Sequence, residues 1–192
     1  MEITTAQTTG RGNHIQEKQI FSVVIAYEDF SAGKHAKQTY DCLVRHLGGD
    51  FEFENQMWKF DVLENAKLNE MAAKDASTAD LIIVSTHGVG DLPREVKQWI
   101  DQWMRHTSAM ALVTLVDRPP HGRHREEDIV RPYLERVARK ARMDFFAQPD
   151  EWPDREDDYS LQQFSDRAQR TSTLMATFIH QHASAPRWGI AQ

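Results

Sequence analysis

The sequence predicts an α/β domain in three layers, built on a doubly wound, five-stranded parallel sheet. Apolar, largely β-branched runs at 20–26, 81–84 and 109–116 contain too little polar alternation for half-exposed strands, which is typical of strands buried on both faces. Amphipathic helical patterns lie between these runs. Such alternation requires right-handed crossovers and helices on both faces of the sheet, and the simplest strand order is 2-1-3-4-5.

Length and composition favour one domain. A chain of 192 residues with 40% hydrophobic residues can bury one sizeable core. We expect a disordered tail at 1–19, the domain at 20–183 and a C-terminal tail at 184–192. The net charge of −6 disfavours nucleic-acid and membrane partners. The single cysteine, Cys42, and the lack of an apolar span or signal peptide predict a cytoplasmic, bacterial protein.

The first half of the domain carries a helical pattern and an aromatic strand. The pattern at 36–47 predicts a helix that ends at the glycine pair 48–49. Residues 51–63 alternate aromatic and polar side chains with a break before Trp58, which predicts a partly exposed or bulged strand at the edge of the sheet. Trp58 and Phe60 would either pack on the core or mark the surface of a homodimer.

The second half repeats the alternation. Residues 65–78 show a helical period and lead into the strand at 81–84. Pro93 suits the first turn of a helix. The apolar stripe of that helix, expected in the core, consists of Val96, Trp99, Ile100, Trp103 and Met104. The remaining predicted elements are a helix at 130–141, a strand at 143–147, an acidic linker at 149–160 and a closing helix at 161–179.

Residues 79–104, ADLIIVSTHGVGDLPREVKQWIDQWM, combine a strand, a small polar loop, a proline and a lysine-bearing amphipathic helix. The pattern P-x-x-x-K-x-x-I-D is matched by Pro93, Lys97, Ile100 and Asp101. This segment resembles the third strand, loop and helix of the flavodoxin-like superfamily, especially its reductase branch. The resemblance implies a flavodoxin-like fold and an FMN-type site, with the flavin ring near residues 85–91 and the phosphate near the first loop.

The two loops at the switch between the first and third strands contain the predicted binding residues, because ligands of doubly wound sheets bind outside the carboxyl ends of the strands. Side chains of the first loop would contact the phosphate, and backbone amides of 86–90 would hold the ring. No side chain is then required for proton chemistry, so no catalytic residue is predicted. The predicted cofactor-binding residues are Ser31, Gly33, Lys34, Ser85, Thr86, His87, Gly88 and Gly90.

The first loop departs from the flavodoxin pattern. Flavodoxins surround the phosphate with hydroxyl groups and glycine, whereas this loop reads YEDFSAGKHA. Glu28 and Asp29 would repel a phosphate unless they point away or are paired. The predicted loop at 118–125, RPPHGRHR, lacks the glycine-rich or aromatic character expected beside a flavin ring, and its arginines suit an anionic group.

Two functions of different classes follow. The first is binding of an FMN-like flavin or another phosphorylated small ligand, with a redox role, as in a flavin-dependent oxidoreductase, if the ligand is FMN. The alternative is a cofactor-less regulatory or protein-interaction module related to flavodoxins or receiver domains. Glu28 and Asp29 resemble the paired acids that hold Mg²⁺ in receivers, but the predicted strand end at 85–87 offers no carboxylate to phosphorylate.

Histidine and acidic residues are also expected at the same edge of the sheet. Imidazole and carboxylate groups there could ligate a transition metal. None of them has a tight ligand spacing, so no metal site is predicted. The residues considered are His87, His121, His124, Glu28, Asp29, Asp91 and Asp117.

Overall fold

The computed structural model describes residues 18–88, 90–116, 129–147, 173, 175–179 and 181. Strands and helices alternate in the predicted order: β1 (Gln19–Tyr27), α1 (Phe30–Leu47), β2 (Phe51–Lys59), the 3₁₀ helix η1 (Phe60–Glu64), α2 (Ala66–Thr78), β3 (Leu81–Thr86), α3 (Arg94–Trp103), β4 (Ala111–Val116), α4 (Val130–Ala141) and β5 (Asp144–Ala147). The strands form a parallel five-stranded sheet in the order β2-β1-β3-β4-β5. The predicted topology is therefore confirmed.

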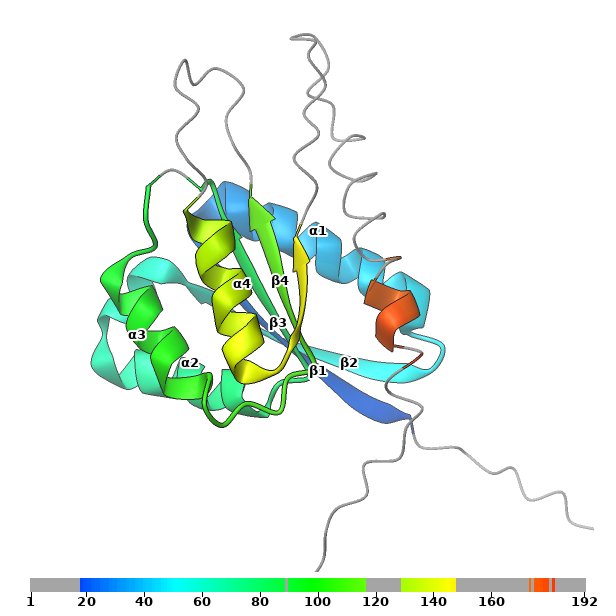
Figure 1. Ribbon diagram of the computed structural model, residues 1–192. Helices are drawn as coiled ribbons and strands as arrows, with labels where there is room; N and C mark the ends of the chain where they lie inside the picture. Colours follow the sequence, from blue (N-terminus) through cyan, green and yellow to red (C-terminus); the bar gives the residue numbers. More distant parts are fainter. Residues whose placement is uncertain are drawn as a thin grey trace, which may run out of the picture.

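Helices cover both faces of this sheet (Figure 1). On one face, α2, α3 and α4 pack over alternate residues of the central strands, such as Ile82 and Leu112. On the other face, α1 and the helical residues 175–179 pack over the intervening residues, such as Ile83 and Val113. All residues of β3 and β4 are buried, which explains why their sequences read as unbroken apolar runs.

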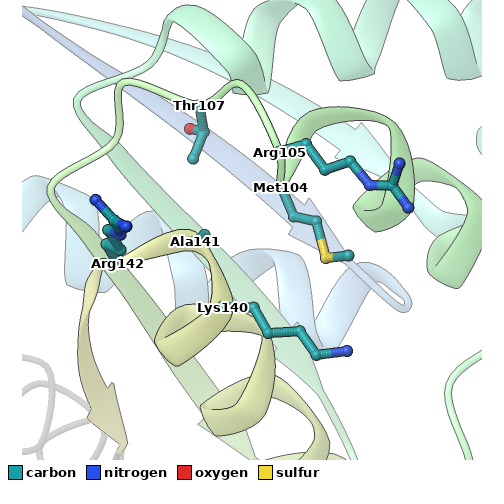
Figure 2. A pocket seen from close by; sticks show the side chains of 6 residues that line it. All are labelled: Met104, Arg105, Thr107, Lys140, Ala141 and Arg142. Carbon is teal, nitrogen blue, oxygen red and sulfur yellow. The ribbon is translucent and has the colours of Figure 1, made fainter.

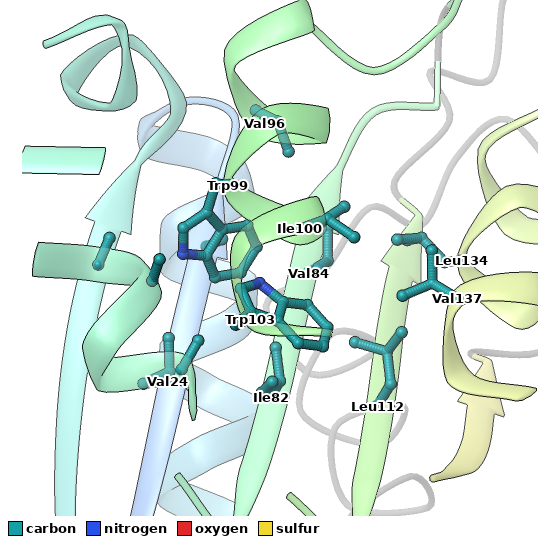
Figure 3. Close-up of a cluster of buried hydrophobic side chains, with 14 of the residues drawn as sticks. Val24, Ile82, Val84, Val96, Trp99, Ile100, Trp103, Leu112, Leu134 and Val137 are labelled. Carbon is teal, nitrogen blue, oxygen red and sulfur yellow. The ribbon is translucent and has the colours of Figure 1, made fainter. Parts of the chain in front are cut away.

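Trp99 and Trp103 form the centre of the core beneath α3 (Figure 3). Both side chains are 0% exposed, and their rings meet edge to face with centroids 5.4 Å apart. This arrangement suits the charge distribution of aromatic rings. Their predicted core position is confirmed.

The edge strand β2 is shorter than predicted. It pairs with β1 without interruption from Phe51 to Lys59, and η1 follows at once. The break in the aromatic pattern therefore marks a change to a 3₁₀ helix, in which Phe60 and Leu63, three residues apart, both face the core. Trp58 packs against the same core, and its indole N–H donates to Asp75 Oδ2 at 3.2 Å. These two aromatic residues are thus accounted for by packing within the chain.

Asn69 on α2 connects three elements in the interior. Its side chain is 4% exposed, and its Nδ2 donates to the carbonyl oxygens of Leu63 at 2.9 Å and Glu95 at 3.0 Å. Its Oδ1 accepts a hydrogen bond from Gln102 Nε2 at 2.7 Å. Because the amide N–H groups and the carbonyl oxygen of this buried side chain are all hydrogen-bonded, Asn69 fixes the position of α3 over η1 and α2.

The predicted closing helix is described only in part. Residues 173, 175–179 and 181 are helical, and Met175, Ala176 and Ile179 are buried on the α1 face of the sheet. Of the predicted tails at 1–19 and 184–192, residues 1–17 and 184–192 lie outside the described residues, as does the predicted linker at 149–160, and β1 already begins at Gln19. None of the helices within the described ranges is long and apolar enough to cross a membrane.

Candidate functional site at the carboxyl edge of the sheet

The candidate site lies where β1 and β3 end side by side. β1 lies between β2 and β3, so the order of the strands reverses at this point. The chain leaves β1 at Tyr27 and enters α1 at Phe30, and it leaves β3 at Thr86 and enters α3 at Arg94. The backbone N–H of Glu28 donates to the Ser85 carbonyl at 3.0 Å, which continues the pairing into the first loop.

Glu28 holds the loop that follows β3. Its Oε2 accepts hydrogen bonds from Thr86 Oγ1 at 2.5 Å and from the backbone N–H of His87 at 2.8 Å. Thr86 Oγ1 in turn accepts from the backbone N–H of Gly88 at 3.1 Å. The carboxylate is therefore directed at the neighbouring loop, and hydrogen bonds to a charged acceptor are among the stronger ones in proteins.

Asp29 caps helix α1 and binds His87. Its Oδ1 accepts from the Ala32 backbone N–H at 3.0 Å, which is the usual contact of an N-cap aspartate. Its Oδ2 lies 3.0 Å from His87 Nε2. The Ala32 N–H, with a smaller contribution from His87, lowers the pKa of Asp29 below its usual value. Both carboxylates thus have hydrogen-bond partners, but only Glu28 points away from the start of α1, whereas Asp29 occupies it.

This pairing changes what the start of α1 can bind. The first N–H groups of a helix attract phosphate, but here the Asp29 carboxylate already accepts from one of them. Glu28, although directed at the loop after β3, adds a second negative charge one residue before Asp29. The phosphate half of FMN does not fit this arrangement, because it would have to compete with the Asp29 carboxylate for the N–H groups at the start of α1.

The loop after β3 contains two glycines in the left-handed backbone conformation. Gly88 and Gly90 have φ values of 66° and 74°, a region that side chains other than glycine rarely adopt. A Cβ atom at Gly90 would meet nothing within 4 Å, so the backbone there is open. The His87 side chain beside it is 27% exposed. These features leave the Gly90 backbone and the His87 imidazole open at the switch point, whereas the N–H groups of His87 and Gly88 already donate within the site.

The other predicted binding residues have different surroundings. Ser31 and Lys34 are exposed on the first turns of α1. Gly33 is buried, and a Cβ atom there would lie 2.7 Å from the Tyr27 ring, so the close approach of this ring accounts for the glycine. Ser85 is buried as well, and its Oγ donates to the Ala32 carbonyl at 2.8 Å. Gly33 and Ser85 thus join β1 and β3 to α1, and their cofactor role stays a prediction.

Four of the candidate metal ligands lie within the described residues: Glu28, Asp29, His87 and Asp91. Within the described ranges, no three His, Cys, Asp or Glu side chains gather as metal ligands would. Asp91 forms an ion pair with Lys97 on α3. Asp117, His121, His124 and the arginines of the loop at 118–125 lie outside the described residues.

Removal of the Asp29 cap should destabilise the protein in a pH-dependent way. We expect Asp29→Ala to lower the free energy of unfolding by about 1 kcal/mol at pH 7. Since folding lowers the pKa of Asp29, its contribution is complete above the unfolded pKa of about 3.9 and is lost as the pH falls through the lower folded value. Urea unfolding of both proteins at pH 7 and below pH 4 measures this difference.

The control is Asp41→Ala, which removes an exposed partner of Lys37 on the same helix. It should cost no more than about 0.5 kcal/mol. A cost for Asp29→Ala that equals the control at pH 7, or that grows on acidification, would contradict the assigned cap.

Comparison with known proteins supports the fold. No family model matches the chain, and no curated protein matches it. Among solved structures, Smu.1420 from Streptococcus mutans has a TM-score of 0.50 at 11% identity, and the match covers 82% of this chain and 100% of that one. A flavodoxin, WrbA-like protein from Agrobacterium tumefaciens has a TM-score of 0.49 at 13% identity, with 84% and 99% coverage. General stress protein 14 from Treponema denticola, solved in complex with FMN, has a TM-score of 0.39 at 12% identity, with 85% and 98% coverage.

The strand order, the helices on both faces and the switch point between β1 and β3 define the class of protein: the fold is flavodoxin-like. This is the fold that the segment at 79–104 predicted. At these identities the similarity concerns the fold, and function has to come from the site.

Proposed function

We propose that this protein binds a small planar ligand of flavin type at the carboxyl edge of the sheet, and that the ligand is held by the loop after β3 rather than by a phosphate at α1. The proposal rests chiefly on one observation: Glu28 holds Thr86 and His87, and so pre-forms the loop that carries Gly88 and Gly90. A pre-formed loop costs little ordering entropy on binding.

The chemistry of the first loop favours a ligand that donates hydrogen bonds. Each oxygen of an ionised carboxylate has two lone pairs, and the two Asp29 oxygens use one each, toward Ala32 and His87. The remaining capacity suits hydroxyl or amine groups and disfavours phosphate. Riboflavin carries a flavin ring and a chain of hydroxyl groups without a phosphate, so it has the required chemistry. A redox role follows if the bound ring is a flavin.

Flavin titration tests this proposal. We expect the fluorescence of riboflavin to be quenched on binding, with a saturable, one-to-one titration curve. FMN should bind no more tightly than riboflavin, because its phosphate meets Glu28 and Asp29. Gly90→Trp, which places a large ring on the open backbone of the loop, should weaken riboflavin binding at least tenfold. Fluorescence titration of the purified protein measures both effects.

The matched control is Gly49→Trp. Gly49 follows α1 at the opposite end of the sheet, and a Cβ atom there also meets nothing within 4 Å. Equal binding by both tryptophan variants would contradict the placement of the site. If neither riboflavin nor FMN binds, the proposal of a flavin-type ligand is wrong.

The second candidate function is a protein-interaction module without a cofactor. One observation favours it: Phe30, directly after Asp29, is 85% exposed at the start of α1, and Ile129 before α4 is 41% exposed. Exposed apolar side chains at one edge are typical of partner surfaces. In that case Phe30→Ser would abolish binding of the partner protein, and the native protein would bind no flavin. The proposed ligand site predicts that the native protein does bind flavin.

A further inference from the structure

A second candidate site lies at the opposite end of the sheet, where α3 and α4 end. A cavity of about 590 Å³ opens there. Its lining residues are Met104, Arg105, Thr107, Lys140, Ala141 and Arg142. Arg105 and Lys140 extend in the same direction from the two helix ends, and Met104 lies between them (Figure 2). Typical small-molecule pockets measure about 300–1,000 Å³, so this cavity has the size of a ligand site.

Three cationic side chains line this cavity without a partner. Within the described part of the chain, Arg105, Lys140 and Arg142 form no side-chain hydrogen bond or ion pair. Some other cations are paired, as Lys97 is with Asp91 and Arg139 with Glu135. What distinguishes Arg105, Lys140 and Arg142 is that the three line one cavity, which gives it a local positive charge in a chain with a net charge of −6.

The ends of the helices do not explain these cations. The Met104 N–H caps α3 by donating to the Ile100 carbonyl at 3.0 Å. At the end of α4, the Met143 N–H donates to the Ala138 carbonyl at 2.9 Å. These carbonyls have backbone donors, and no hydrogen bond from the three side chains to a helix-end carbonyl is formed among the described residues. Two acidic residues are near in sequence, Asp101 and Asp144, but neither lines the cavity.

Arg142 occupies a position that normally takes glycine. Its φ is 58°, and it is the one residue other than glycine with a positive φ among those described. Helices commonly end in this left-handed conformation, and glycine adopts it without the clash that a Cβ atom causes. Its backbone N–H closes the end of α4 on the Ala138 and Arg139 carbonyls, and this position brings the arginine to the lining of the cavity.

We propose that this cavity binds a small polyanion, a molecule that carries two or more phosphate or carboxylate groups. Arginine presents forked donors that match either group, and Lys140 adds a point charge from the second helix. Met104 and Ala141 supply apolar surface for the carbon skeleton of the ligand. This site is independent of the flavin site, because it lies at the amino edge of the sheet.

Titration calorimetry with pyrophosphate and with citrate tests the proposal. We expect saturable one-to-one binding of at least one of them, and none of acetate. Arg142→Gly should weaken binding about tenfold while it keeps the left-handed backbone and does not lower the melting temperature. Lys140→Ala should weaken binding to a similar degree. Binding of pyrophosphate alone assigns a phosphorylated ligand, and binding of citrate alone assigns a polycarboxylate.

The control is Arg139→Gln, which removes one positive charge from the same helix outside the lining of the cavity. It should change the affinity less than twofold. An equal loss in Arg139→Gln and Arg142→Gly would show a general charge effect and overturn the proposal, as would the lack of saturable binding of both polyanions.

Discussion

Replacement of Trp103 by alanine is expected to lower the free energy of unfolding by about 3–5 kcal/mol, because it leaves a cavity in the centre of the core. Trp103 is 0% exposed and contacts the equally buried Trp99. The whole stability of a domain this size is about 5–15 kcal/mol, so this loss is a large share of it. Urea unfolding followed by far-UV circular dichroism measures the effect without depending on the lost indole.

Trp103→Phe separates packing from hydrogen bonding. The buried indole Nε1 of Trp103 has no hydrogen-bond partner among the described residues, so phenylalanine loses packing volume but no polar contact. We expect less than half of the cost of the alanine variant. A phenylalanine variant as unstable as the alanine variant would contradict the assignment of this residue to packing alone.

The second large effect concerns Asn69. We expect Asn69→Ala to lower the free energy of unfolding by about 2–3 kcal/mol. The reason is that the backbone carbonyls of Leu63 and Glu95 both lose the side-chain N–H group that donates to them. Thermal unfolding of the variant beside the native protein measures this cost.

The control is Gln102→Ala, which removes only the contact to Asn69 Oδ1 from an exposed residue. It should cost less than about 1 kcal/mol, since the contact is at the edge of the interior. The double variant should cost less than the sum of the two, because both changes break the same contact. Simple additivity would mean that Asn69 does not connect α2 to α3 as described.

The fold could be predicted because its strongest determinants are local and periodic. Runs such as that of β3 are buried on both faces, and their alternation with amphipathic helices leaves few topologies. The end of β2 could not be predicted in the same way. Phe60 and Leu63 suit either a strand with a bulge or a 3₁₀ helix, and only packing against the core decides between them.

The candidate site could be located but not described from sequence. The rule for doubly wound sheets predicts which loops meet, and the structure brings Glu28 and Asp29 next to Thr86 and His87. Whether acids repel a ligand or bind a neighbouring loop depends on side-chain direction, which sequence does not contain. One clue was available: aspartate is a common N-cap, and Asp29 as the N-cap would have placed the start of α1 at Phe30.

Asn69 and the cationic cavity had no sequence pattern of their own. Asn69 reads as an ordinary polar residue in a helix, and its burial arises from three elements distant along the chain. Arg105 and Arg142 are separated by β4 and α4, and they line one cavity only because α3 and α4 end at the same edge. Such groupings become visible when the fold is known.

The central claim is that a flavin-type ring binds at the carboxyl edge without a phosphate contact at α1. The most direct test is a fluorescence titration of the protein with riboflavin and FMN in parallel, at the same ionic strength. We expect saturable binding of riboflavin, with FMN bound equally tightly or more weakly. FMN binding at least tenfold more tightly than riboflavin would show that the phosphate is recognised and would contradict the role given to Glu28 and Asp29.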